Sequence, residues 1–135
     1  DWAEESLGAR LVVTLGILPV AQPEPAIAAL RRALDAMDTW ELTALAVIAQ
    51  ACGSLVLALA LARGRIDADE AFALSQLDES YQIERWGEDA EAARRRTALH
   101  DDIRDAWRFM LLARGDVRAA AGEAQQQGRK AGLRS

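Results

Sequence analysis

The pattern of apolar positions divides the chain into an irregular N-terminal segment and a long helical region. Within residues 1–24, the run over residues 11–14 is rich in β-branched side chains, which favour strands. Gly16 and a group of prolines then interrupt the pattern. We predict a short helix over residues 3–7, a short strand over residues 11–14 and a turn-rich connector.

From Pro25 onward, apolar side chains recur at steps of three and four residues, the spacing of one face of a helix. Acidic capping signals and glycines mark the ends of successive helices. They predict four main helices, over residues 25–38, 39–62, 67–86 and 88–114. The fold class is therefore mainly α, an orthogonal or irregular helical bundle of about four main helices with a small β-containing N-terminal segment. The expected domains are an N-terminal segment (1–24), a helical domain (25–115) and a polar, low-complexity tail (116–135).

One stretch, over residues 42–62, carries no formal charge and is long enough to raise the question of a membrane span. It is rich in Ala, contains Gln50 and Ser54, and is flanked closely by charged helices without an aromatic belt. A helix that is apolar on every side in a globular protein is usually the central one. We therefore expect a buried core helix and no membrane insertion.

Composition and charge exclude several classes of function and of binding site. The chain has 135 residues, 27% of them charged, and a formal net charge of -5. This acidic balance argues against a nucleic-acid partner. A single cysteine, Cys52, excludes an intrachain disulfide and a cysteine-clustered metal site.

The residue patterns typical of catalysis do not occur. The one histidine, His100, lies in a helix rich in Arg and Asp, where we expect it to be solvated. No glycine-rich phosphate loop follows a strand, and the acidic residues lack metal-ligand spacing. We predict that the protein is not an enzyme and uses no metal or cofactor.

The segment over residues 77–87 is the densest mixture of aromatic, amide and charged groups. At helical spacing, Leu74, Leu77 and Tyr81 fall on one side, which we interpret as a core face. The opposite side carries Phe72, Gln76, Glu79, Gln82, Ile83 and Trp86. Two interpretations stay open for that second side. Glu79 and Gln82 either pair with a neighbouring helix, or the face is a docking patch in which Trp86 and Phe72 anchor a partner.

Three sequence blocks carry a resemblance to a known family: WELTAL at residues 40–45, SLVLALALARGRI at 54–66, and above all LDESYQIERWG at 77–87. They resemble the helical C-terminal region of the assembly chaperone of the F-type ATP synthase. That chaperone binds the alpha subunit of the catalytic F(1) sector. The resemblance implies that the family's β-rich N-terminal domain is absent from this chain.

The resemblance also implies a function and a site. The expected function is to hold free alpha subunit, without enzymatic activity, until the beta subunit replaces the chaperone. The expected partner-binding residues are Glu79, Gln82, Trp86, Phe72, Ile83, Tyr81 and Gly87. An Arg- and Ala-rich composition favours an alphaproteobacterial protein of the bacterial cytoplasm, or of the mitochondrial matrix if eukaryotic. The alternative is a helical enzyme or regulatory domain whose active site is completed by a missing N-terminal part.

Overall fold

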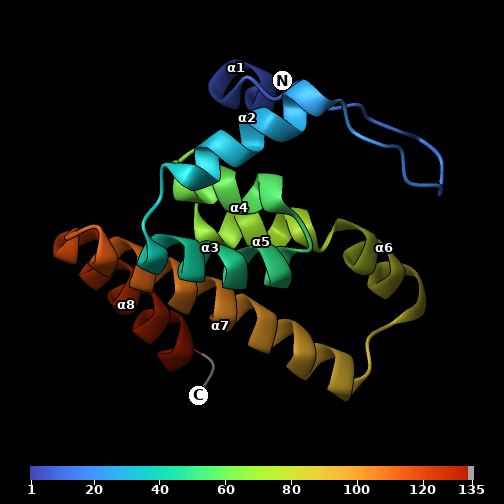
Figure 1. Cartoon of the computed structure of the whole chain (residues 1–135). Helices are drawn as coiled ribbons and strands as arrows, with labels where there is room; N and C mark the ends of the chain where they lie inside the picture. Colours follow the sequence, from blue (N-terminus) through green and yellow to red (C-terminus); the bar gives the residue numbers. More distant parts are fainter. Residues whose placement is uncertain (134–135) are drawn as a thin grey trace. The chain divides into compact units, whose positions relative to one another are not determined.

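The described part of the chain, residues 1–133 of a computed structural model, folds into α-helices joined by turns and loops (Figure 1). The helices are α1 (Trp2–Leu7), α2 (Glu24–Asp35), α3 (Thr39–Cys52), α4 (Leu55–Ala62), α5 (Ala68–Ser75), α6 (Leu77–Trp86), α7 (Ala90–Ala113) and α8 (Val117–Gly132). Residues 1–133 contain no strand. The prediction of a mainly α fold is confirmed, whereas the prediction of a β-containing N-terminal segment is wrong.

The run over residues 11–14 forms no strand because a side chain occupies the place of a partner strand. The Gln22 amide accepts a hydrogen bond from the Val12 N–H at 2.8 Å and donates one to the Val12 carbonyl at 3.0 Å. These two bonds satisfy the backbone groups that a neighbouring strand would otherwise bind. The β-branched side chains therefore belong to an irregular loop between α1 and α2.

Contacts within the chain group it into two units, the first over residues 1–42 and the second from Thr43 onward. The first unit contains α1 and α2. Its small core consists of buried Ala9, Ala26 and Ala29, covered by the half-buried side chains of Leu7, Leu11 and Leu30. The domain boundaries predicted at residues 24 and 115 stay a prediction.

The long apolar stretch in the second unit is two helices and not one. Gly53 adopts a φ of 64°, a left-handed conformation that closes the end of α3. Ser54 then starts α4, its hydroxyl accepting a hydrogen bond from the Leu57 N–H at 3.3 Å. The prediction of one continuous helix over residues 39–62 is therefore wrong, because a left-handed glycine and a serine cap stand side by side.

The core of the second unit contains α4 and one side of α3, whereas Val47 on the other side of α3 is 42% exposed. The prediction of a helix buried on every side is therefore confirmed only in part. The largest fully buried side chains of this unit are Ile48 of α3, Leu59 and Leu61 of α4, and Ile103 and Met110 of α7. Arg114, after α7, donates a hydrogen bond to the Ala62 carbonyl at the end of α4 at 2.6 Å. Among the described residues, no helix combines the length and apolar character that a membrane span requires.

The predicted third helix is also divided, at Gln76. The Ser75 hydroxyl donates a hydrogen bond to the Phe72 carbonyl at 2.7 Å, a side-chain bond that competes with the regular helix pattern. Gln76 has non-helical dihedral angles and separates α5 from α6. The prediction of one helix over residues 67–86 is therefore wrong at this residue.

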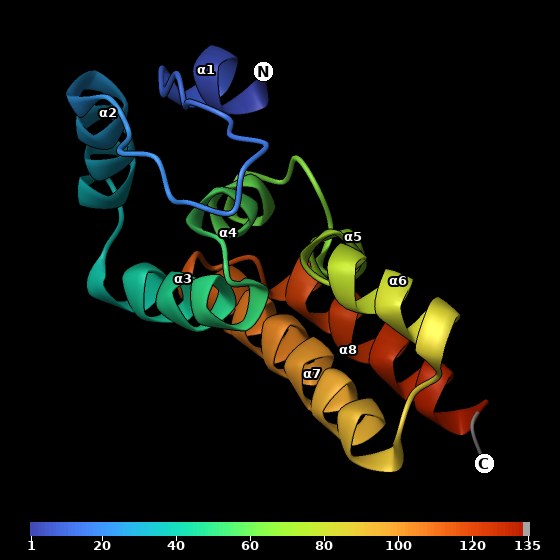
Figure 2. The ribbon, with the colours of Figure 1, turned by 90° about the vertical axis from the view of Figure 1, so that its right-hand side faces the viewer.

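The last two helices of the described chain form a hairpin. α7 closely matches the predicted fourth helix, and Gly115, with a φ of 78°, ends it. The stretch expected as a polar tail forms α8, which begins at an N-cap: Asp116 accepts a hydrogen bond from the Ala119 N–H at 3.0 Å. α8 then runs alongside α7 (Figure 2). Its Ala-rich sequence has a high helix propensity, and one buried residue, Ala120, anchors it.

Candidate functional site

The predicted third helix, whose second half carries the LDESYQIERWG block, corresponds to α5 and α6. Asp67 starts α5 with a capping box: its carboxylate accepts from the Glu70 N–H at 2.8 Å, and Glu70 accepts from the Asp67 N–H at 2.9 Å. Gly87, with a φ of 84°, ends α6. The sequence therefore predicted both outer ends of the predicted third helix correctly.

The face expected to be the core side of this block points into solvent. Leu74, Leu77 and Tyr81 are 44%, 63% and 60% exposed, so the prediction of a core face is wrong. The other side of α6 is turned toward α7 instead. There, Ser80 accepts a hydrogen bond from Arg96 of α7 at 3.2 Å, and Gln76 is buried at the start of the helix.

The residues of the predicted docking face are divided between inner and outer positions. Glu79 and Ile83 are half-buried, whereas Gln82, Gly87 and Trp86 are exposed, Trp86 at 79%. The Glu79 carboxylate has no hydrogen bond or ion pair among the described residues. The interpretation that it pairs with a neighbouring helix therefore finds no contact in the described structure.

Arg85 organises the exposed end of α6. Its guanidinium donates a hydrogen bond to the Tyr81 hydroxyl at 3.1 Å and lies 5.8 Å from the centre of the Trp86 ring. Both contacts hold an aromatic side chain at the surface in a defined position. Exposed, ordered aromatic residues of this kind are typical anchors of protein–protein contacts.

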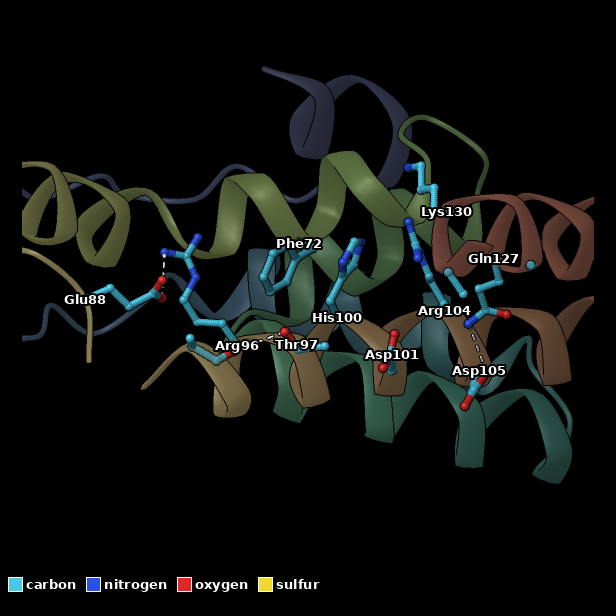
Figure 3. A pocket seen from close by; sticks show the side chains of 13 residues that line it. Phe72, Glu88, Arg96, Thr97, His100, Asp101, Arg104, Asp105, Gln127 and Lys130 are labelled. Carbon is cyan, nitrogen blue, oxygen red and sulfur yellow. Dashed lines mark hydrogen bonds and ion pairs between the residues drawn. The ribbon is translucent and has the colours of Figure 1, made fainter. Parts of the chain in front are cut away.

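Phe72 of the same predicted face packs against α7. Its ring stacks on the His100 ring at a centroid distance of 4.3 Å, and the Arg96 guanidinium lies 5.9 Å from its centre. Figure 3 shows these three side chains along one groove. Phe72 is therefore half-buried, while Trp86 at the end of α6 is exposed.

A carboxylate that the sequence analysis did not single out joins three helices of the second unit. Asp69 of α5 accepts hydrogen bonds from His100 at 2.8 Å and from Arg104 at 2.6 and 3.0 Å, both of α7. Lys130 of α8 contacts its second oxygen. Burial opposes ionisation, but the bonds from Lys130, Arg104 and His100 outweigh it and hold the pKa of Asp69 well below its usual range.

These contacts correct the prediction that His100 is a freely solvated residue. Its ring is fixed between the Asp69 carboxylate and the Phe72 ring, and its side chain is only 21% exposed. The sequence signal was present: His100 and Arg104 are four residues apart and share one face of a helix. Asp69 had no such signal in the sequence, because acidic residues are common in the first turn of a helix.

A groove of about 950 Å³ runs along α7, where α8 and Phe72 form its other sides (Figure 3). Its polar lining includes Arg96, His100, Arg104 and Lys130, together with Glu88, Asp101 and Asp105. Gln127 donates to Asp105 at 3.3 Å, and Arg96 lies 3.8 Å from Glu88. Its charges thus balance within the groove, which favours a scaffold role for them.

Metal-ligating side chains and the single thiol complete the description of the candidate site. No group of His, Cys, Asp and Glu side chains among the described residues could hold a metal ion. Burial raises the pKa of the Cys52 thiol to about 11, so the thiol stays protonated at neutral pH and is a poor nucleophile.

Comparison with known proteins gives a consistent relationship. No protein-family model matches the chain. Among solved structures, Atp12 from Paracoccus denitrificans is 44% identical with a TM-score of 0.79, over 83% of this chain and 48% of that protein. Over most of its length, this chain is similar to Atp12. The resemblance inferred from the three sequence blocks is thereby confirmed.

Two further proteins are similar to this chain. A protein of Agrobacterium tumefaciens, described as a candidate chaperone, is 40% identical with a TM-score of 0.73, over 82% of this chain and 41% of that one. Mitochondrial Atp12 from Schizosaccharomyces pombe is 29% identical over 87 residues, which are 62% of this chain and 30% of that protein. The chain spans about half the length of the solved Atp12 structures, and its relatives occur in bacteria and in mitochondria.

Proposed function

We propose that this chain is the helical part of an assembly chaperone that binds the free alpha subunit of F(1)-ATPase. It covers the subunit's aggregation-prone interface until the beta subunit takes its place, and it does so without enzymatic activity, nucleotide or metal. The observation that carries the proposal is the 44% identity to Atp12 over 83% of the chain. The bacterial sources of the solved relatives support a location in the bacterial cytoplasm.

The proposed contact residues are those of the LDESYQIERWG block and its neighbour on α5. Trp86 and Tyr81 supply exposed aromatic surface, and Arg85 holds both in place. Glu79 supplies a carboxylate without an internal partner among the described residues. The set is Glu79, Gln82, Trp86, Phe72, Ile83, Tyr81 and Gly87. A carboxylate that loses water at an interface needs a donor on the partner, which gives the contact its register.

Charge reversal at Glu79 tests the proposal. Glu79→Lys would place a cation against the expected donor, a change that commonly costs several kcal/mol at a desolvated interface, on the order of 3. We expect a melting temperature close to that of the unchanged chain and a large loss of protection of isolated alpha subunit against aggregation. Light scattering of the alpha subunit, without ATP, measures the protection.

The matched control is Asp102→Lys, a charge reversal at an exposed position of α7. This variant should protect the alpha subunit as well as the unchanged chain does. A large fall in the melting temperature of Glu79→Lys would assign Glu79 to the scaffold. Unchanged protection by a folded Glu79→Lys variant would remove Glu79 from the client surface, and absence of protection by the unchanged chain would contradict the proposed function itself.

A further inference from the structure

α6 is a helix without a buried residue. Each of its ten residues is exposed or half-exposed, and the helix makes few contacts with the other helices of the second unit. Its tie to α7 includes the hydrogen bond from Arg96 to Ser80. A helix of this length is marginal in water unless packing supports it. The exposed side of α6 is therefore surface that a partner could cover with a gain in stability.

That exposed side carries an apolar stripe. Leu77 and Tyr81 lie one turn apart on α6, and Leu74 precedes them across the break at Gln76. We call these three residues the outer stripe. Their exposed fractions, 44% to 63%, are high for side chains of this size on neighbouring turns. The stripe lies on the opposite side of α6 from Glu79 and Ile83.

Two carboxylates without an internal partner and one engaged cation lie beside the outer stripe. Asp78 and Glu84 flank it, both are exposed, and neither has a hydrogen bond or ion pair among the described residues. The nearby cation, Arg85, is already engaged with Tyr81 and Trp86. An apolar strip bordered by unpaired carboxylates is complementary to a segment whose apolar side chains are bordered by Lys or Arg.

We infer that the outer stripe is a second contact with the alpha subunit, made by a segment of that subunit in which apolar side chains alternate with basic ones. The inference rests on the proposed function and extends the proposed contact surface from Tyr81, which belongs to both sets, to Leu77 and Leu74. Because Tyr81 and Trp86 are held by the same arginine, the two contacts are continuous on one helix. The alpha subunit then covers the solvent-facing side of α6, while α7 lies on its inner side, and this adds packing that the helix lacks.

The test measures the affinity of purified alpha subunit for the chain by titration calorimetry without nucleotide. Leu77→Ser removes the centre of the outer stripe, and Asp78→Lys/Glu84→Lys reverses the charges beside it. Val117→Ser is a close control, because Val117 is also the first residue of a helix and is 64% exposed against 63% for Leu77. We expect about tenfold weaker binding or more for the two stripe variants, and unchanged binding for the control. Added salt should weaken binding of the unchanged chain more than that of the charge-reversed variant.

Each outcome of this test either supports or overturns the inference. If the unchanged chain does not bind alpha subunit, the proposed function fails and the inference fails with it. If the unchanged chain binds and Leu77→Ser matches Val117→Ser, the inference is overturned while the proposed function stands. Sedimentation of the chain alone completes the test: self-association that Leu77→Ser abolishes would assign the stripe to a second copy and overturn the inference. A large fall in the melting temperature of Leu77→Ser would do the same by placing Leu77 in the scaffold.

Discussion

At the scale of single residues, the second unit depends on one carboxylate that accepts hydrogen bonds from three side chains. Asp69 receives His100 and Arg104 from α7 and Lys130 from α8, so one side chain of α5 ties three helices together. Because the charged form makes these bonds, folding lowers the pKa of Asp69. The side chain is 40% exposed, so solvent screens part of the attraction.

Asp69→Asn should lower the stability of the fold at neutral pH by on the order of 1 kcal/mol, as expected for a partly exposed cluster. A carboxylate whose pKa is lowered by folding stabilises the fold above its unfolded-state pKa, about 4, and loses that contribution as pH falls toward the lowered value. The difference in melting temperature between the chain and Asp69→Asn should therefore be constant from pH 8 to about 5 and shrink below about 4. A difference that grew with acidity would contradict the assigned role of Asp69.

Cys52 and His100 should both be dispensable for protection of the alpha subunit. The Cys52 thiol is buried and protonated, and His100 acts on the scaffold through Asp69 and Phe72. We expect Cys52→Ser and His100→Gln to keep full protection in light scattering, with a lower melting temperature for His100→Gln. Loss of protection by a folded His100→Gln variant would favour the enzymatic alternative.

At the scale of helices, the apolar periodicity predicted where helices occur but not where they divide. The breaks at Gly53 and Gln76 depend on one or two residues, whereas the pattern around them is continuous. The strand expected over residues 11–14 failed because a strand requires a partner, and a sequence alone does not show that Gln22 replaces one. The exposed side of α6 was misjudged for a similar reason. Periodicity identifies the two faces of a helix but not which of them meets the core.

Burial within α4 predicts unequal costs for two leucines. Leu59 is fully buried, so Leu59→Ala should cost about 2–5 kcal/mol, including the cavity that it leaves. Leu55 at the start of the helix is half-buried, and Leu55→Ala should cost clearly less. Urea unfolding of the two variants measures both values. Equal costs would contradict the placement of α4 in the core.

At the scale of the whole molecule, the sequence blocks predicted the relationship to Atp12, whereas the structure was needed to find the exposed side chains that a partner could contact. The LDESYQIERWG block was specific enough to predict the Atp12 relationship, because a run of aromatic, amide and charged residues is rarely explained by packing alone. The sequence alone did not predict the exposure of Leu74 and Leu77 or the cluster around Asp69, because both depend on how α5, α6 and α7 pack.

Binding of isolated alpha subunit, followed by replacement with beta subunit, tests the central claim most directly. The chain and purified alpha subunit are mixed without nucleotide, and the species are separated by size. We expect a complex that elutes ahead of either component and that loses the chain when beta subunit is added. Absence of the complex with folded alpha subunit, or a complex that keeps the chain after beta subunit has bound, would contradict the account.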